Sequence, residues 1–372
     1  MPSTKQSVKP PKKSKRAQVG TFLRKGIADG TFPPGSQLPS TTELATMWKT
    51  QAPTVHRAMV ELAKEGLIDR IPRMGTYVRQ QQRPLKSVGI YALIETPQPE
   101  QAKFTHMVCH QLQIQLMKQG IDVIIWTDRA SDPNSMASWK ALQDAVSEHR
   151  IQGLIIPQTD WQHLEAARRL HVPSSTLSCS ASLQGGVRLD QKDFIQAGVA
   201  ALAEYGAKRL GFITVAERPL PSGEYPSGQL GIDQPLFFTE QVRALGLETR
   251  PGWIRTPENG ELIPEDTAEK RGYDMFMSIW DQEEKPDALL VYTDVAARGV
   301  LLAAALKKAR IPEDIQFAFH RNVGGGFFCP VPALFLDLSV EEVASQLIEQ
   351  LLLQYEGKKA PVRRIGYHVS FS

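Results

Sequence analysis

From Ser87 onward, short apolar runs alternate with stretches of helical periodicity. Runs of four to six residues, such as those in Val88–Ile94 and Ala288–Tyr292, are typical of strands buried on both faces of a sheet. The stretches between them, such as Phe104–Gln119, are long enough for helices. Alternation of this kind places parallel strands in a sheet that helices cover, so the sequence predicts a doubly wound α/β architecture.

This pattern extends over about 285 residues, which is large for one sheet. We therefore expect two similar lobes, with a ligand between them at the carboxyl ends of the strands. The expected strands are Val88–Ile94, Val123–Trp126, Gly153–Pro157, Arg209–Val215, Ala288–Tyr292 and Gln316–Phe319. The expected helices are Phe104–Gln119, Ser138–Arg150, His163–Leu170, Lys192–Tyr205, Pro235–Leu245, Ala268–Asp281 and Asp294–Lys308.

The chain before Ser87 follows another order: helix, helix, turn, helix and hairpin. Ser40 and Glu43 form a capping-box pattern, in which each side chain reaches the other's backbone amide at the start of a helix. Gly66 ends the last helix. The expected elements are helices at Lys15–Asp29, Thr41–Lys49 and Pro53–Glu65, and short strands at Leu67–Arg70 and Thr76–Arg79.

These patterns divide the chain into four regions. We expect a disordered basic tail at 1–14, a winged helix-turn-helix domain at 15–79, a polar linker at 80–86 and a two-lobed effector-binding and dimerisation domain at 87–372. The N-terminal module is the basic part. Residues 1–80 hold 14 Lys and Arg against 5 Asp and Glu, although the whole chain has a net charge of only +3. A basic module on an acidic body indicates a polyanionic partner for that module alone, or else a solvated basic tail.

Several classes of protein are excluded by composition. Hydrophobic content of 42% and charged content of 22% are those of a globular protein. The sequence has no apolar run of the roughly 20 residues that a membrane helix needs, so we expect no membrane association. The first residues lack the apolar core of a secretory signal, and three widely spaced cysteines suit a reducing compartment. We expect a cytoplasmic protein that is nucleoid-associated when it is bound to DNA.

The second helix of the predicted helix-turn-helix carries polar side chains away from its apolar face. Such a helix fits a major groove, where His56 and Arg57 can donate to bases or phosphates and Thr54 to a phosphate. Lys64 lies off the apolar face as well. Arginines of the hairpin suit backbone or minor-groove contact: Arg70, Arg73 and Arg79. A small helical dimerisation domain with ordinary basic side chains is the alternative.

These residues resemble the GntR-type winged helix-turn-helix. The matching positions include Gly30-x-Phe32-x-Pro34-Gly35, Leu38-Pro39-Ser40-x-x-Glu43-Leu44-Ala45, Leu62-x-x-Glu65-Gly66-Leu67-Ile68 and Gly75-Thr76-Tyr77-Val78. The resemblance implies DNA contacts from Ser40, Thr41 and Gly75 in addition to the basic residues above. The family prefers other residues where this chain has Thr42, Gln51-Ala52 and His56, and its wing usually has Gly-x-Gly where this chain has Arg73-Met74-Gly75, which indicates an altered target sequence.

The rest of the chain resembles the effector-binding domain of LacI/GalR repressors. The matching blocks are Val187-x-x-Asp190, Gly206-Ala207-Lys208-Arg209-Leu210-Gly211-Phe212-Ile213, Val291-Tyr292-Thr293-Asp294-x-Ala296-x-x-Gly299-Val300 and Ala309-Arg310-Ile311-Pro312-Glu313-Asp314-Ile315. A GntR head on a LacI-type body is the arrangement of arabinose-repressor-type regulators. We expect a homodimer on double-stranded operator DNA, because paired heads read paired half-sites, with an interface at helices flanking the first lobe such as Phe104–Gln119. The effector that the resemblance implies is a small sugar or sugar derivative.

The resemblance ranks five residues first as effector contacts: Asp190, Thr293, Asp294, Arg321 and Asn322. Further candidates at strand ends are Glu95, Asp128 and Gln158, with Trp126 or Trp253 for stacking on a sugar. Asp190 and Asp294 could equally cap the helices that follow them, and the tryptophans could be core residues. The family has an acidic residue near the position of Arg321, so a reversed charge there suggests an anionic or uncommon sugar ligand.

Other functions find less support. His106, Cys109 and His110 share a predicted helix, but no third ligand is placed beside the two histidines, so we expect no metal. Gly324-Gly325-Gly326 lacks the Lys-Ser/Thr of a phosphate loop and suggests a flexible loop over the pocket. No nucleophile elbow or lysine for pyridoxal phosphate is evident, so we expect neither an enzyme nor a cofactor. We predict a ligand-responsive transcription regulator, a repressor; the alternatives are a non-regulatory sugar-binding protein and a GntR-headed pyridoxal-phosphate enzyme.

Overall fold

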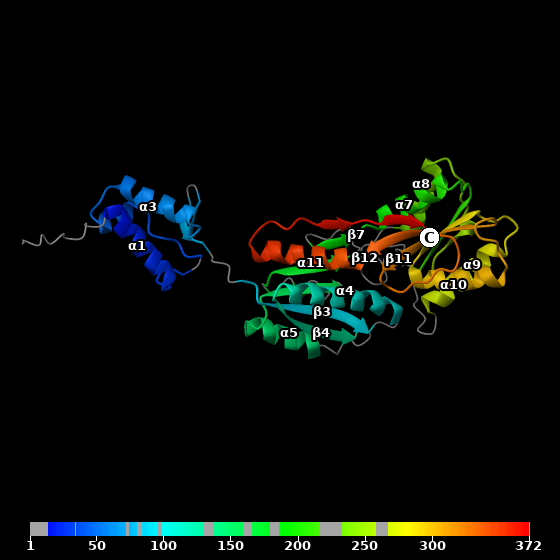
Figure 1. The fold of residues 1–372 in the computed structure, drawn as a ribbon, viewed down its shortest axis with the longest axis horizontal. Coiled ribbons are helices and arrows are strands. Elements are labelled where there is room, and N and C mark those ends of the chain that lie inside the picture. Colours follow the sequence, from blue (N-terminus) through cyan, green and yellow to red (C-terminus); the bar gives the residue numbers. More distant parts are fainter. Residues whose placement is uncertain are drawn as a thin grey trace, which may run out of the picture. The chain divides into compact units, whose positions relative to one another are not determined.

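The computed structural model describes residues 14–33, 35–71, 74–79, 84–95, 99–129, 137–158, 166–167, 169–170, 172–178, 186–215, 233–257 and 267–371. The chain divides into two compact units, Met1–Pro84 and Leu85–Ser372. The division falls inside the stretch that the sequence predicts as a linker. Each unit is described by itself (Figure 1).

The first unit is a three-helix bundle with a hairpin. Its elements are α1 (Lys15–Ala28), α2 (Thr41–Met47), α3 (Ala52–Lys64), β1 (Ile68–Ile71) and β2 (Gly75–Val78). They match the predicted elements to within about three residues. The core contains residues of all five elements, including the fully buried Leu23, Leu44 and Met59. The segment before α2 pairs with β2 through an isolated antiparallel bridge between Gln37 and Tyr77, where the amide of Leu38 donates to the carbonyl of Thr76 at 2.8 Å.

The second unit has two lobes, each built on a six-stranded sheet in the part of the chain that is described. The first sheet has the order β13-β7-β6-β5-β3-β4 and is parallel throughout. Its strands are β3 (Ser87–Glu95), β4 (Asp122–Arg129), β5 (Gly153–Gln158), β6 (Ser174–Ser178), β7 (Val187–Leu189) and β13 (Arg363–Ile365). Its helices are α4 (Pro99–Lys118), α5 (Ala137–Ser147) and α11 (Val340–Tyr355), with α4 and α5 on opposite faces (Figure 1).

The second sheet has the order β14-β12-β11-β10-β8-β9, and its edge strand β14 is antiparallel. Its strands are β8 (Leu210–Thr214), β9 (Ile254–Arg255, after a 3-10 turn at Pro251–Trp253), β10 (Ala288–Tyr292), β11 (Gln316–Val323), β12 (Leu334–Ser339) and β14 (His368–Phe371). Its helices are α7 (Gln191–Glu204), α8 (Gln234–Ala244), α9 (Ala268–Trp280) and α10 (Asp294–Leu306). The predicted doubly wound fold with two similar lobes is therefore confirmed.

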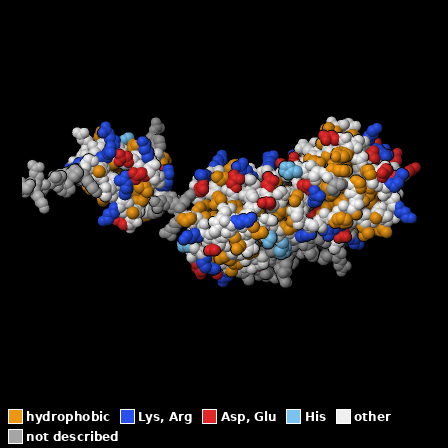
Figure 2. All heavy atoms as spheres, viewed as in Figure 1, with side chains coloured by type: hydrophobic (Ala, Val, Ile, Leu, Met, Phe, Trp, Pro, Cys, Tyr) orange, Lys and Arg blue, Asp and Glu red, His pale blue; other side chains and the backbone are white. Residues whose placement is uncertain are grey.

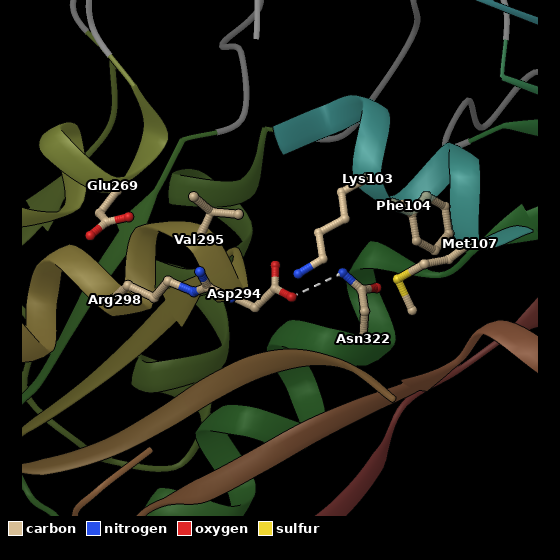
Figure 3. A pocket seen from close by; sticks show the side chains of 8 residues that line it. All are labelled: Lys103, Phe104, Met107, Glu269, Asp294, Val295, Arg298 and Asn322. Carbon is tan, nitrogen blue, oxygen red and sulfur yellow. Dashed lines mark hydrogen bonds between the residues drawn. The ribbon is translucent and has the colours of Figure 1, made fainter. Parts of the chain in front are cut away.

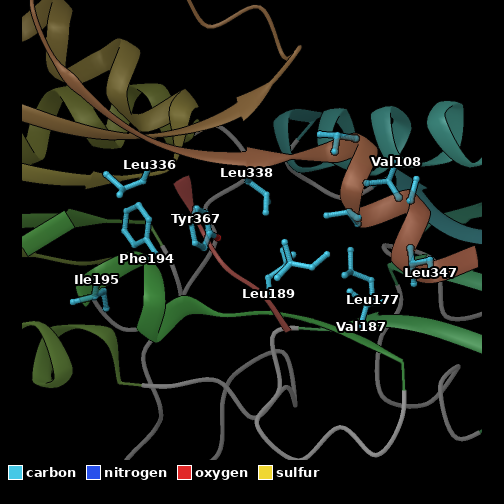
Figure 4. Packing of buried hydrophobic residues seen from close by; sticks show 14 of the residues in the cluster. Val108, Leu177, Val187, Leu189, Phe194, Ile195, Leu336, Leu338, Leu347 and Tyr367 are labelled. Carbon is cyan, nitrogen blue, oxygen red and sulfur yellow. The ribbon is translucent and has the colours of Figure 1, made fainter. Parts of the chain in front are cut away.

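The chain crosses between the lobes three times within the described ranges: after β7, after β12 and between β13 and β14. Asp193 of α7 joins the first crossing to the third, since its Oδ2 accepts from the amide of Tyr367 at 2.7 Å. Gly366 makes room for that contact, because a Cβ there would lie 2.5 Å from the same oxygen. Buried apolar residues such as Val108, Leu189 and Phe194 continue from one lobe to the other beside these crossings (Figure 4).

Some strands and one helix are not predicted by the sequence pattern. β6 alternates small polar residues with buried ones, and β7, β9 and β13 contain two or three residues, too few for a periodicity. β12, β14 and α11 were also not predicted, although β12 and α11 are largely buried. The predicted helix at His163–Leu170 falls mostly outside the described residues.

Candidate DNA-binding face and ligand pocket

The capping box at the start of α2 is present in the structure. The amide of Glu43 donates to the Ser40 hydroxyl at 3.2 Å, and the amide of Ser40 donates to the Glu43 carboxylate at 2.7 Å. Such a reciprocal pair satisfies two amides that a helix start leaves unbonded. Thr41 turns inward, with its hydroxyl 3.7 Å from the sulfur of Met59 on α3. α2 and α3 are thereby fixed against each other as a helix-turn-helix.

α3 presents polar side chains on the side away from its buried residues Val55, Met59 and Leu62. His56, Arg57 and Lys64 are exposed, and Thr54 is partly buried. Arg57 makes no hydrogen bond or ion pair with the described part of the chain. Its guanidinium is therefore available to an external acceptor such as a base edge or phosphate.

Other arginines of the head are already paired. Arg16 contacts Glu61, and Arg24 contacts Glu65. The visible face of the head in Figure 2 accordingly mixes acidic with basic side chains. Arg79 pairs with Asp69 across the hairpin, and its pKa is raised by that hydrogen bond. On α3 and the adjoining hairpin, the exposed basic side chains of Arg57, Lys64 and Arg70 make no ion pair with the described residues.

The hairpin lies beside the exposed side of α3. Arg70 of β1 places its guanidinium 3.0 Å from Nε2 of His56 on α3. Gly75 begins β2 with a φ of 126°, a conformation that suits glycine. A Cβ at Gly75 would lie 2.4 Å from the side-chain amide of Gln37, so the glycine has a packing role. Arg73, a predicted DNA contact, lies outside the described residues.

The two-lobed unit contains a pocket of about 240 Å³ formed by both lobes (Figure 3). α4 of the first lobe contributes Lys103, Phe104 and Met107. The second lobe contributes residues of α9, α10 and β11: Glu269, Asp294, Val295, Arg298 and Asn322. The volume is below the range of about 300–1,000 Å³ typical of drug-sized ligands, so it suits a small molecule.

The polar groups of this pocket come from both lobes. Asn322 donates from its side-chain nitrogen to Oδ2 of Asp294 at 3.4 Å, while its own Oδ1 is buried without a partner in the described chain. Lys103 reaches across from the first lobe and donates to the carbonyl of Gly325 at 2.5 Å. The site therefore offers two carboxylates, from Asp294 and Glu269, an amide oxygen from Asn322, and two cationic groups, from Lys103 and Arg298.

Two of the five residues ranked first by sequence, Asp294 and Asn322, line this pocket. Asp294 is the first residue of α10, whose cap is Thr293, and Asp294 is only 7% exposed. Thr293 makes no side-chain capping bond. Asp190 instead caps α7, since its carboxylate accepts from the amides of Lys192 and Asp193 at 3.2 and 3.4 Å.

Arg321 does not line the described pocket. Its guanidinium makes a two-pronged ion pair with Asp337, at 2.6 and 2.8 Å, and also donates to the hydroxyl of Ser370 at 3.0 Å. It lies 4.0 Å from the centre of the Phe335 ring. The charge of Arg321 is thus neutralised within the second sheet, which leaves the anionic-ligand hypothesis without support from this residue.

The remaining candidates have other positions. Glu95 and Gln158 end β3 and β5, as predicted for strand ends, but their side chains lie outside the described residues. Asp128 is buried and accepts from Tyr91 and from the amides of Ser138 and Trp139, so it fixes the start of α5. Trp253 is a core residue at 1% exposure, and Trp126 packs partly buried against the first sheet's core.

The sequence interpretation missed Lys103, Phe104 and Met107 of α4, and Glu269, Val295 and Arg298 of the second lobe. α9 begins near the same edge as α10, which could have suggested Glu269. Nothing in the sequence pairs α4 with α10, because they are about 190 positions apart. The contact depends on how one lobe faces the other.

The three side chains weighed above as metal ligands differ in their exposure. His106 and His110 are exposed on α4, whereas Cys109 is buried and burial raises the pKa of its thiol to about 12. No cluster of three or more metal-ligating side chains is found within the described ranges. Over the same residues, no helix has the length and apolar character needed to span a membrane.

Comparison with known proteins assigns both units. Residues 15–78 match the family model of bacterial regulatory proteins, gntR family, and residues 199–369 match the periplasmic binding protein-like domain. The HTH-type transcriptional repressor PurR of Edwardsiella ictaluri is 21% identical over 291 residues, which are 76% of this chain and 77% of PurR.

Solved structures show the same fold for the body. The trehalose repressor from Escherichia coli has a TM-score of 0.57 and 18% identity, over 77% of this chain and 99% of that one. The transcriptional regulator CelR in complex with cellobiose has a TM-score of 0.58 and 14% identity, over 86% and 89%. The chain therefore joins a gntR-family helix-turn-helix domain to a periplasmic-binding-protein-like domain with the fold of LacI-family regulators.

Proposed function

We propose that this protein is a ligand-responsive, DNA-binding transcription regulator that acts as a repressor. The observation that carries the proposal is a single chain with two features. One is a gntR-family reader helix whose His56 and Arg57 are exposed. The other is a pocket that takes residues from both lobes of a periplasmic-binding-protein-like body. The relatives are regulators rather than enzymes, which disfavours the pyridoxal-phosphate alternative.

In the DNA-bound state, α3 lies in the major groove. Arg57 and His56 contact base edges or phosphates, and Thr54 and Lys64 contact the backbone. Ser40 and Thr41, at the start of α2, face a phosphate through the helix N-terminus. Arg70 extends the basic surface onto the hairpin, beside His56. Arg73 and Gly75 are further proposed DNA contacts.

The effector is a small sugar or sugar derivative held between the lobes. Asp294 accepts from ligand hydroxyls, and the buried Oδ1 of Asn322 accepts another. Phe104 and Met107 supply an apolar wall. Thr293, Asp190, Glu95 and Gln158 remain proposed contacts of the wider cleft. Arg321 instead pairs with Asp337, so we expect it to act on stability. Because the ligand contacts both lobes, it binds their closed arrangement more tightly than their open one. This difference in binding free energy sets how much the ligand can change the affinity for the operator.

We further infer a two-fold homodimer, because paired heads would read paired half-sites. α4 is the proposed interface helix. It exposes Met117 to 62% near its end. Sedimentation equilibrium of the full chain tests this point, with a Met117→Glu variant expected to weaken the dimer. A monomer at all concentrations would contradict it.

The decisive experiment selects duplexes from a random pool with the full chain, then measures their mobility shift as sugars and sugar acids are added. We expect a selected duplex to bind with steep salt dependence and a neutral or acidic sugar to change its affinity. Ligand binding without any duplex binding, even in dilute buffer, would favour a non-regulatory sugar-binding protein. Absorbance near 420 nm in the pure protein would favour the pyridoxal-phosphate enzyme.

A further inference from the structure

The tip of the hairpin exposes two large apolar side chains in an otherwise basic module. Ile71 ends β1 at 42% exposure, and Met74 precedes β2 at 63%. Exposed apolar side chains that come singly are ordinary, but a pair at the end of a hairpin is a small apolar tip. Nothing in the described part of the first unit covers it.

The backbone that presents Met74 is held by three hydrogen bonds. Its amide donates to the carbonyl of Ile71 at 3.1 Å. Its carbonyl accepts from the side-chain amide of Gln37 and from the hydroxyl of Tyr77, each at 3.1 Å. Gln37 reaches this carbonyl by passing over Gly75, where any Cβ would collide with it. The backbone of Met74 is thus held by Ile71, Gln37 and Tyr77.

The hairpin also has a fixed relation to the reader helix. The 3.0 Å contact between Arg70 and His56 places the outer end of β1 next to the exposed side of α3. A duplex whose major groove holds α3 would bring an adjacent minor groove or backbone to the hairpin. Proteins that bind minor grooves insert Met, Ile, Leu or Phe between base steps, which unstacks the step and bends the duplex.

We propose that Met74 is an apolar wedge that enters the minor groove next to α3 and partly unstacks one base step in each half-site. Ile71 supports its base. The wedge makes the protein prefer flexible pyrimidine–purine steps at that position, a sequence preference that needs no hydrogen bond to a base. This inference rests on the proposed DNA-binding function and adds to it a residue that determines specificity.

The test uses the full chain and a duplex selected from a random pool by the wild-type protein. 2-Aminopurine, which brightens when it is unstacked, is substituted singly along each half-site, and energy transfer between the duplex ends reports bending. Three variants are compared: Met74→Gln, which keeps the length but adds polarity; Met74→Leu, which stays apolar; and Leu306→Gln, a control at the end of α10 that is 61% exposed.

We expect wild-type protein and Met74→Leu to brighten one position in each half-site and to bend the duplex. Met74→Gln should lose both signals and bind about tenfold more weakly, because less apolar surface is buried. Its salt dependence should match that of the wild type, since an apolar contact displaces no counterions. Leu306→Gln should behave as the wild type.

Two results would overturn the wedge while leaving the proposed function intact: wild-type binding without brightening or bending, and brightening that survives in Met74→Gln. Failure of the wild-type protein to bind any duplex would overturn both. Thermal unfolding of each variant shows whether a loss of binding comes from misfolding. Because the substituted side chains are exposed, the unfolding temperature should not change.

Discussion

The ammonium of Lys103 donates a hydrogen bond to the carbonyl of Gly325, a residue 222 positions later in the chain. The contact ties α4 of the first lobe to the glycine loop of the second. The same loop is held by α10, since Arg298 donates to the carbonyl of Gly326 at 3.4 Å. The glycine run predicted as a loop over the pocket is therefore one end of a polar link between the lobes.

Replacement of Lys103 by Met should weaken effector binding, because it removes both this link and a charged group of the pocket. We expect a loss of about tenfold in affinity, within the usual range of conformational coupling. Isothermal titration with the sugar found in the mobility-shift screen measures it. Lys118→Met, at the end of the same helix, is the control and should bind normally. Equal affinities for the two variants would remove Lys103 from the site.

Arg57 should be the main determinant of DNA affinity on α3. Arg57→Ala should cost about 1–3 kcal/mol of binding free energy, measured by mobility shift on the selected duplex. A base contact would relax the sequence preference at one position, whereas a phosphate contact would lower the salt slope by about one. Arg243→Ala, an exposed arginine of α8, is the control. Unchanged binding by Arg57→Ala would exclude α3 as the reader helix.

The pair of Arg321 and Asp337 should act on stability rather than on ligand affinity. Either single variant, Arg321→Met or Asp337→Leu, leaves a partly buried charge without its partner and should cost about 2 kcal/mol of unfolding free energy. The double variant should lose less than the sum of the two. Urea unfolding measures the cycle, and titration of the effector runs beside it. A large loss of ligand affinity at full stability would return Arg321 to the effector site.

His320 should make the body sensitive to mild acid. Burial among Phe194, Tyr292 and Tyr367 lowers the pKa of His320 to about 4, against the opposing attraction of Asp294 and Asp337. The unfolded chain takes up this proton near pH 6.5, so the unfolding free energy is highest above that pH and falls towards pH 4. The loss should be at most about 3 kcal/mol.

His320→Phe should flatten this part of the pH profile, because a phenyl ring suits the aromatic surroundings and binds no proton. Urea unfolding of both proteins between pH 7 and pH 4 measures the difference. Profiles that remain parallel over this range would assign the acid sensitivity to other groups.

Local sequence patterns were enough to predict the helices and strands of the N-terminal unit. The Ser40–Glu43 capping box, the apolar spacing of α3 and the glycine after it act over a few residues, so the elements could be placed from the sequence to within a turn. The same holds for the buried strands β3, β8 and β10, whose apolar runs are continuous. Short or polar strands such as β6 and β7 have no such run, because their place in the sheet is decided by neighbours distant in the chain.

The ligand pocket likewise has residues that the sequence could predict and residues that it could not. The sequence alone identified Asp294 and Asn322, since each lies at or near the carboxyl end of a strand. It proposed Arg321 as a ligand contact but could not show that Asp337 on the adjacent strand pairs with it. It missed Lys103 because this side chain of α4 lines a pocket only where the second lobe lies opposite the helix. Local hydrogen bonds and hydrophobic spacing depend on residues close together in the sequence. Charge pairing and pocket lining depend on contacts between distant segments, which only the folded chain brings together.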